Sequence, residues 1–131
     1  MSKTFQAQIL TPEGSLYEGE VEGVQVPGKS GNFLILFNHA PIVSTLGVGP
    51  VIIKKPDNTE ITYAVSGGFV EINDNHMTLL AEKATESSEI DVEEAKKLRE
   101  DAKERLKDMN NDLEKAEKDL AIAENNLKIA Q

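Results

Sequence analysis

The chain has 131 residues, 14 basic against 23 acidic side chains, a formal net charge of -9 and no cysteine. The length allows one or two small domains, and the lack of cysteine excludes disulfides, thiolate nucleophiles and Cys-based zinc or iron–sulfur sites. The acidic balance argues against nucleic acid as the main partner, and no apolar stretch approaches the roughly 20 residues that span a bilayer, so we expect no direct membrane insertion.

Composition divides the chain into two parts. All nine Gly, all five Pro and all six aromatic residues lie before residue 70, whereas the tail from Thr85 consists mainly of Ala, Leu, Glu, Lys, Asp and Asn. Short apolar runs between turn residues are typical of strands, and a charged tail without Gly or Pro is typical of helices. We therefore predict an α+β fold, with a β-sandwich domain at residues 1–84 and a helical hairpin arm at residues 85–131.

The first part contains short apolar runs; in some of them, such as Phe5–Leu10, apolar and polar residues alternate, whereas Phe33–Phe37 is apolar throughout. They lie at Phe5–Leu10, Leu16–Tyr17, Val21–Val26, Phe33–Phe37, Val51–Ile53, Ile61–Val65, Phe69–Ile72 and Met77–Leu80. Turn-forming residues separate them, for example at Pro27–Asn32 and Asn73–Asn75. This spacing predicts an antiparallel sandwich or flattened barrel.

The tail predicts two antiparallel helices. Ser88 or Asp91 can cap the first helix, which we expect to run from about Asp91 to Asp108. Asn110 and Asn111 can end it, and Asn111 with Glu114 can cap a second helix that ends near Ala130. Four charge pairs at a spacing of four residues would support the helices: Glu93/Lys97, Asp101/Arg105, Glu114/Lys118 and Glu124/Lys128.

An apolar stripe runs through both predicted helices without a break. Its members follow one another at spacings of three or four residues: Leu98, Ala102, Leu106, Met109, Leu113, Ala116, Leu120, Ala123, Leu127 and Ala130. The same stripe suits a packed hairpin or one continuous helix of about 40 residues, roughly 60 Å long. We hypothesise that the arm can change between these forms; a static hairpin is an equally good interpretation.

Candidate chemistry in the chain is sparse. The run Gly23–Ser30 has the letters of a phosphate-binding loop, but a β run follows Ser30 where that motif needs a helix, so we interpret it as a turn between strands. His39 and His76 are the only histidines; we expect His39 to fix a strand end by hydrogen bonding and His76 to be solvated. We expect no catalytic residues, no metal site and no cofactor.

The order of several motifs identifies a family. Asn38-His39-Ala40-Pro41, Ser66-Gly67-Gly68-Phe69, Leu79–Glu82 and Ile90-Asp91 before a charged helical tail resemble the epsilon subunit of F-type ATP synthases over nearly the whole chain. The resemblance implies a central-stalk rotor subunit at the foot of the gamma subunit and on the c-ring. Such a subunit couples proton-driven rotation to ATP synthesis in the catalytic alpha and beta subunits.

The resemblance also implies sites. The residues that would face the c-ring and gamma are Gly28, Lys29, Ser30, Gly31, Asn32 and His39, although the family often has an acidic residue where Asn32 stands. The subunit would lie on the cytoplasmic face of a bacterial membrane or the stromal face of a thylakoid. The missing transit peptide favours a bacterial or plastid-encoded chain.

The arm carries two further implications of the resemblance. In many relatives it extends along gamma towards alpha and beta and inhibits ATP hydrolysis. Some relatives bind ATP on the hairpin through a motif that matches here at Ile90, Asp91, Glu94 and Ala95, where Glu94 replaces an arginine. Because a carboxylate repels phosphate, we predict weak or absent ATP binding.

Two other functions remain open from the residues. One is a non-catalytic β-sandwich adaptor whose helical arm docks a coiled-coil partner, and the other is a small phosphate-loop NTPase. Co-purification with gamma and a c-ring would separate the rotor subunit from the adaptor, and ATP turnover by the lone chain would be needed for the NTPase.

Overall fold

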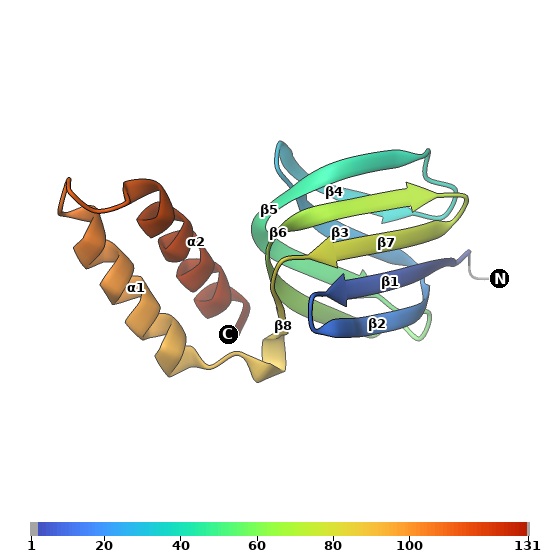
Figure 1. Ribbon diagram of the computed structural model, residues 1–131. Coiled ribbons are helices and arrows are strands. Elements are labelled where there is room, and N and C mark those ends of the chain that lie inside the picture. The colour runs from blue at the N-terminus through green and yellow to red at the C-terminus, as the bar shows by residue number, and fades with distance from the viewer. Residues whose placement is uncertain (1–2, 131) are drawn as a thin grey trace.

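The computed structural model describes residues 3–130; Met1, Ser2 and Gln131, which the predicted domain ranges include, lie outside it. A β-sandwich is followed by two antiparallel helices (Figure 1). The predicted α+β fold is confirmed. The strands are β1 (Phe5–Thr11), β2 (Gly14–Val21), β3 (Gly23–Gly28), β4 (Gly31–Leu36), β5 (Ile42–Lys54), β6 (Glu60–Asn73), β7 (His76–Ala81) and β8 (Ala84–Glu86).

One continuous sheet builds both layers of the sandwich. Its strand order is β2-β1-β7-β6-β5-β3-β4, and β8 pairs with β6. The long strands β5 and β6, of 13 and 14 residues, pair with each other along most of their length and pass from one layer to the other (Figure 1). The pairing of β1 with β7 is parallel, with Ala7 opposite Met77. The prediction of a wholly antiparallel sandwich was therefore wrong at this one pair of strands.

The space between the layers is filled by aliphatic side chains. Ile9, Val24, Ile35 and Leu79 are completely buried there. Along β1 the alternation seen in the sequence places Phe5, Ala7 and Ile9 inward, because successive side chains of a strand point to opposite faces. Burial of each large aliphatic side chain contributes about 1.5–3 kcal/mol.

Asparagine and aspartate shape the tight turns. Asp74 and Asn75 have φ of 51° and 59° in the two-residue turn between β6 and β7, as the Asn73–Asn75 pattern predicted. Asn75 also accepts a hydrogen bond through Oδ1 from the Asn38 backbone N (2.7 Å) and donates one through Nδ2 to Asn38 Oδ1 (3.0 Å). These bonds join that turn to the loop after β4.

The arm consists of a short 3-10 turn at Ser87–Glu89, helix α1 (Val92–Leu106) and helix α2 (Leu113–Ala130). Asp91 caps α1, since its Oδ1 accepts a hydrogen bond from the Glu94 backbone N at 3.1 Å. The predicted cap of α2 was wrong by one residue. Asp112 accepts the bond from the Lys115 backbone N, whereas the Asn111 side chain donates to the Arg105 carbonyl at the end of α1.

Only one of the four predicted charge pairs forms among residues 3–130. Asp101 and Arg105 are 2.9 Å apart, as expected. Glu93 contacts Lys96 at 3.6 Å instead of Lys97. Lys118 contacts Glu82 of the sandwich, because α2 lies against the sandwich and α1 lies outside it (Figure 1).

The predicted apolar stripe faces inward along α1 and along α2, but not in the turn that connects the two helices. Ala102, Ala116, Ala123 and Leu127 are buried, and Leu98, Leu106, Leu113, Leu120 and Ala130 are partly buried. Met109 is 82% exposed in the turn between α1 and α2. In this hairpin the stripe is therefore interrupted at Met109, because the chain reverses there.

Candidate docking surface for partner subunits

The predicted interface turn connects β3 to β4. Lys29, Ser30, Gly31 and Asn32 are exposed, and the Lys29 backbone N donates to the Thr45 carbonyl at 3.0 Å. Gly28 stands opposite Gly31 in a tight hairpin, and β4 follows at once. The interpretation of the phosphate-loop letters as a turn between strands is confirmed.

His39 lies beyond the other end of β4. Its backbone N donates to the Leu36 carbonyl at 3.1 Å, and its ring Nδ1 is 2.7 Å from the Ala40 carbonyl oxygen. The hydrogen bond at the end of β4 is thus made by the His39 backbone, whereas the ring contacts only the neighbouring residue. Strand β4 spans about 17 Å between the turn and Leu36 at roughly 3.3 Å per residue, so His39 and Gly28–Asn32 do not form one compact site.

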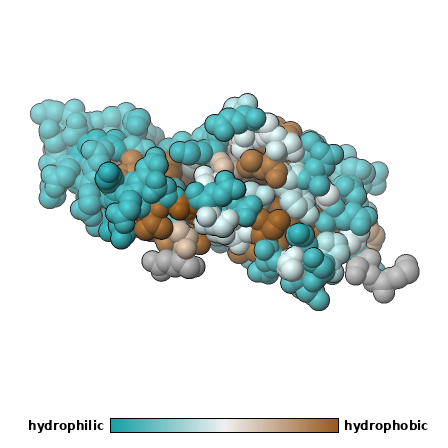
Figure 2. Space-filling view, turned by 90° about the horizontal axis from the view of Figure 1, so that it is seen from below, coloured by the Kyte–Doolittle hydropathy of each residue, from teal (hydrophilic) through white to brown (hydrophobic). Residues whose placement is uncertain are grey.

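A row of apolar side chains crosses the outer face of the sandwich near the arm. Leu10 of β1 pairs with Leu80 of β7, Leu80 pairs with Phe69 of β6, and Phe69 pairs with Thr45 of β5. Phe69 is 48% exposed and Leu80 is 37% exposed. Apolar patches interrupt the hydrophilic surface where the sandwich adjoins the arm, whereas the far end of the arm is hydrophilic (Figure 2).

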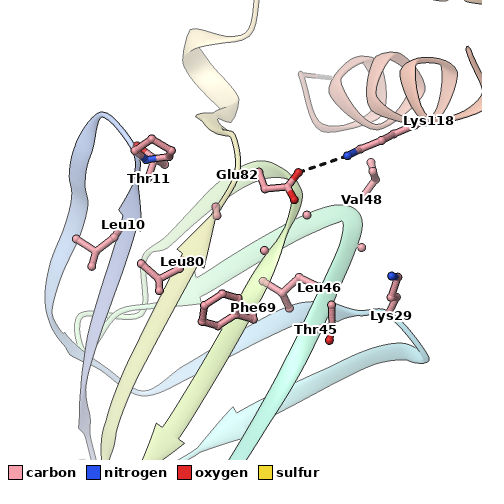
Figure 3. Close-up of a pocket in the computed structure, with 15 residues that line it drawn as sticks. Leu10, Thr11, Lys29, Thr45, Leu46, Val48, Phe69, Leu80, Glu82 and Lys118 are labelled. Carbon is pink, nitrogen blue, oxygen red and sulfur yellow. Dashed lines mark hydrogen bonds and ion pairs between the residues drawn. The ribbon is translucent and has the colours of Figure 1, made fainter. Parts of the chain in front are cut away.

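This row forms the floor of a groove of about 790 Å³. In Figure 3 the Leu80, Phe69 and Leu46 side chains lie below the ion pair of Glu82 with Lys118, which spans 3.4 Å at the rim. Other lining residues are Leu10, Thr11, Pro12, Lys29, Thr45, Gly47, Val48, Gly67, Gly68 and Ala81. An apolar centre with a charged rim is the usual composition of a protein–protein interface.

The Ser66-Gly67-Gly68-Phe69 motif shapes this groove. Gly67 and Gly68 have φ of 81° and 128°, which favour glycine. A Cβ at Gly67 would lie 2.8 Å from Glu82 Oε2, and one at Gly68 would overlap the Leu80 carbonyl oxygen. The two glycines therefore allow β6 to lie close to β7 and leave room for the Glu82 carboxylate.

Phe69 and Leu80 were not among the predicted site residues. The signal was present in the alternation of Phe69-Val70-Glu71-Ile72, where Val70 and Ile72 are buried and Phe69 points outward. Only the register across three strands shows that the outward residues form a row.

The four degenerate ATP-motif positions do lie together. Ile90, Asp91, Glu94 and Ala95 line a hollow of about 560 Å³ between the start of α1 and α2. The charged side chains around it are Lys83, Glu89, Asp91, Glu94, Lys97 and Asp101, so carboxylates outnumber lysines by four to two. Asp91 is already used as the helix cap, and the acidic lining is unfavourable for a polyphosphate.

In the part of the chain that the structure describes, neither helix is both long and apolar enough to cross a membrane. Within residues 3–130, His, Asp and Glu side chains nowhere gather in a group of three or more that could hold a metal ion.

Comparison with known proteins gives a family. Residues 4–87 match the family model described as ATP synthase, Delta/Epsilon chain, beta-sandwich domain. The ATP synthase epsilon chain of Priestia megaterium is 46% identical over 101 residues, which cover 75% of each chain. The ATP synthase epsilon chain of Bacillus subtilis is 43% identical over 98 residues, which cover 75% of this chain and 74% of that one.

Solved structures share the fold. A chain in the Euglena gracilis mitochondrial ATP synthase, described as OSCP/F1/c-ring, superposes with a TM-score of 0.84 at 21% identity, covering 93% of this chain and 78% of that chain. A chain in the central stalk/c-ring of the Tetrahymena thermophila mitochondrial enzyme gives a TM-score of 0.63 at 13% identity over 96% of each chain. The family match and the bacterial relatives together show that this chain belongs to the epsilon subunits of F-type ATP synthase.

Proposed function

We propose that the protein is a non-catalytic rotor subunit of the central stalk, which couples proton-driven rotation of the c-ring to ATP synthesis through gamma. The observation that carries this proposal is the groove floored by Leu10, Phe69 and Leu80. Large exposed apolar patches on a small protein mark interaction surfaces. Relatives in the family are named for the ATP synthase, and solved structures of the same fold come from F1/c-ring assemblies.

Two neighbouring parts of the sandwich surface are assigned to two partners; they adjoin at Lys29, which belongs to the turn and also lines the groove. We assign the apolar groove to gamma, because an apolar floor with a charged rim suits a tight and lasting contact. The exposed turn Gly28–Asn32 is assigned to the c-ring, and Asn32 makes that contact through hydrogen bonds without a formal charge. In this assembly the protein is peripheral on the cytoplasmic face of a bacterial membrane, or on the stromal face of a thylakoid.

A charge placed in the groove tests the gamma contact. Phe69→Glu buries a carboxylate in the interface, so we expect gamma affinity to fall by at least about tenfold, as for a central interface residue. The matched control is Leu34→Glu on β4, since Leu34 is 52% exposed but lies outside the groove. Co-purification of tagged variants with gamma and the c-ring measures both. Equal retention of gamma by the two variants would exclude the groove as its docking site.

For the arm, the proposal is that the hairpin can open, extend along gamma towards alpha and beta, and inhibit ATP hydrolysis. The sequence supports this, because the spacing of three and four residues continues through Met109, so one continuous helix would carry the whole stripe on a single face. Truncation after Glu86 tests it. This position keeps β8, which pairs with β6, and removes the 3-10 turn and both helices.

We expect the truncated subunit to assemble and the ATPase activity of the enzyme to rise. The control is the full chain with a disulfide that locks the hairpin, which should match the truncation in hydrolysis rate. Unchanged hydrolysis in both variants would show that the arm does not inhibit this enzyme.

A further inference from the structure

Two consecutive residues of α2, Lys118 and Asp119, connect this helix to the sandwich and to α1, respectively. Lys118 Nζ lies 3.4 Å from Glu82 Oε2 of the sandwich, and Asp119 Oδ2 accepts a hydrogen bond from Arg105 Nη2 of α1 at 2.7 Å. Among residues 3–130 these are the only ion pairs that join the arm to the sandwich and α1 to α2, respectively. Both ion pairs can therefore form only when the arm is a closed hairpin that lies against the sandwich.

The pair between the helices is the better sheltered. The side chains of Arg105 and Asp119 are 26% and 18% exposed, against 53% and 63% for Lys118 and Glu82. Arg105 Nε also donates to Asp101 Oδ2 at 2.9 Å, and Lys115 Nζ lies 3.3 Å from Asp119 Oδ2. The hydrogen bond from Arg105 holds the pKa of Asp119 below its usual range.

Apolar packing between the helices is thin. The buried side chains of α1 are Ala95 and Ala102, and those of α2 are Ala116, Ala123 and Leu127. Alanine buries little apolar area, so four of these five contribute far less than a leucine would. Leu98, Leu106, Leu113 and Leu120 add partly buried apolar area, and the ion pair between the helices adds to this packing.

Among the ion pairs within the arm, only the pair between the helices distinguishes a hairpin from a continuous helix. Asp101–Arg105 and Lys115–Asp119 each lie four residues apart within one helix, so both survive if the arm straightens. Arg105 and Asp119 are 14 residues apart in the sequence. In a continuous helix they would be separated by about 21 Å at 1.5 Å per residue, and could not meet.

We propose that the Arg105–Asp119 ion pair is the catch that holds the helical arm closed, and that its loss shifts the arm towards the extended form. This inference rests on the part of the proposed function in which the arm can extend. According to this inference, one pair of side chains sets the equilibrium between the closed hairpin and the extended arm.

Distance measurement on the full-length chain tests the catch. Because the protein has no cysteine, Lys97→Cys and Glu124→Cys carry two spin labels without competition. Antiparallel helices with Arg105 facing Asp119 place residues 97 and 124 within a turn of each other. In a continuous helix the 27-residue separation corresponds to about 40 Å. Double electron–electron resonance spectroscopy measures the distance between the two labels and therefore resolves the closed and open populations of the arm.

Asp119→Asn in this labelled chain should raise the ratio of open to closed arm by about fivefold, the upper end of the range for a partly exposed ion pair. The control is Glu117→Gln, which removes the same charge from an exposed side chain of α2 that forms no ion pair among the described residues. Arg105→Gln should match Asp119→Asn, and the double variant should open the arm no further than either single change.

The catch would be overturned if the arm of Asp119→Asn were as closed as that of Glu117→Gln. It would also be overturned if the effects of Arg105→Gln and Asp119→Asn were fully additive in the double variant. Urea unfolding of the sandwich confirms that each variant is folded. Hydrolysis by the assembled enzyme separates this inference from the proposed function. If Asp119→Asn opens the arm but leaves hydrolysis unchanged, the catch stands and inhibition by the arm fails.

Discussion

At the residue scale, backbone geometry and single charges account for the motifs in this chain. Gly67 and Gly68 are required by positive φ and by the closeness of β7. Asp91 is required as a helix cap, which gives it a structural role apart from any nucleotide. A residue that matches a family motif can thus be retained for folding alone.

Gly68→Ala should strongly destabilise the sandwich. Its φ of 128° disfavours any side chain, and the new Cβ would overlap the Leu80 carbonyl oxygen, so we expect a loss of more than about 2 kcal/mol in the free energy of unfolding. The control is Gly47→Ala, where the nearest atom to an added Cβ is the Pro27 carbonyl oxygen at 4.0 Å. Urea unfolding of both variants measures the difference; equal midpoints would contradict the strain at Gly68.

The Asp119 carboxylate should make the arm sensitive to acid. Arg105 and Lys115 lower its pKa in the folded arm, with Asp101 the nearby like charge on α1. A lowered folded-state pKa means a stabilising contribution that is present above the ordinary Asp pKa of about 4 and is lost as pH falls through the lowered value. Thermal unfolding should therefore show the advantage of the parent over Asp119→Asn at pH 7 shrinking below about pH 4; a constant difference would contradict this.

At the element scale, helix caps decided the boundaries that the sequence left open. Both Ser88 and Asp91 fit a cap at the start of the first helix, and the structure selects Asp91, while Ser88 Oγ donates to Glu86 Oε2 at 3.1 Å. Asp112 takes the corresponding place in α2. Asn111 was a reasonable candidate from its neighbours, but its side chain is used to end α1.

Removing the correct cap should weaken α1 alone. We expect Asp91→Ala to cost about 1 kcal/mol of arm stability, because the Glu94 backbone N loses its acceptor. Ser88→Ala should cost almost nothing, since the hydroxyl contacts only an exposed carboxylate. Circular dichroism at 222 nm during thermal unfolding compares the two. A larger effect at Ser88 would show that the cap lies there.

At the scale of the whole molecule, the sandwich has a core of its own. All the buried side chains of that core come from the strands between Phe5 and Ala81, and none comes from α1 or α2. The arm meets the sandwich mainly through α2, next to a polar hollow of about 640 Å³ that includes Ser66, Lys83 and Asp112. We therefore propose that the sandwich folds independently and that its boundary lies after β8.

Two truncations test that boundary. A chain that ends at Glu86 keeps the pairing of Tyr63 with Glu86 and Val65 with Ala84, whereas a chain that ends at Lys83 exposes this part of β6. We expect the longer sandwich to unfold cooperatively and to melt at least about 4 °C above the shorter one, equivalent to roughly 1 kcal/mol. Calorimetry measures both. Identical melting temperatures would place the boundary before β8.

Sequence periodicity and composition were sufficient for the class of fold, for two helices, and for the turn at Gly28–Asn32. Local pattern was not sufficient for the parallel pairing of β1 with β7, because that contact joins residues some 70 positions apart. The docking groove was missed for the same reason: Leu10, Phe69 and Leu80 are outward residues of three strands, and only strand register brings them together.

The sequence by itself determined that this protein is a small acidic sandwich with a helical arm, and its motifs were enough to suggest the ATP synthase epsilon family. These features depend on local propensity and on residue order, which a chain carries before it folds. Only the tertiary structure decided which side chains share the groove, which Asp caps each helix, and that Asp119 meets Arg105. Those contacts depend on how distant elements pack, and a spacing in the sequence is compatible with several such packings.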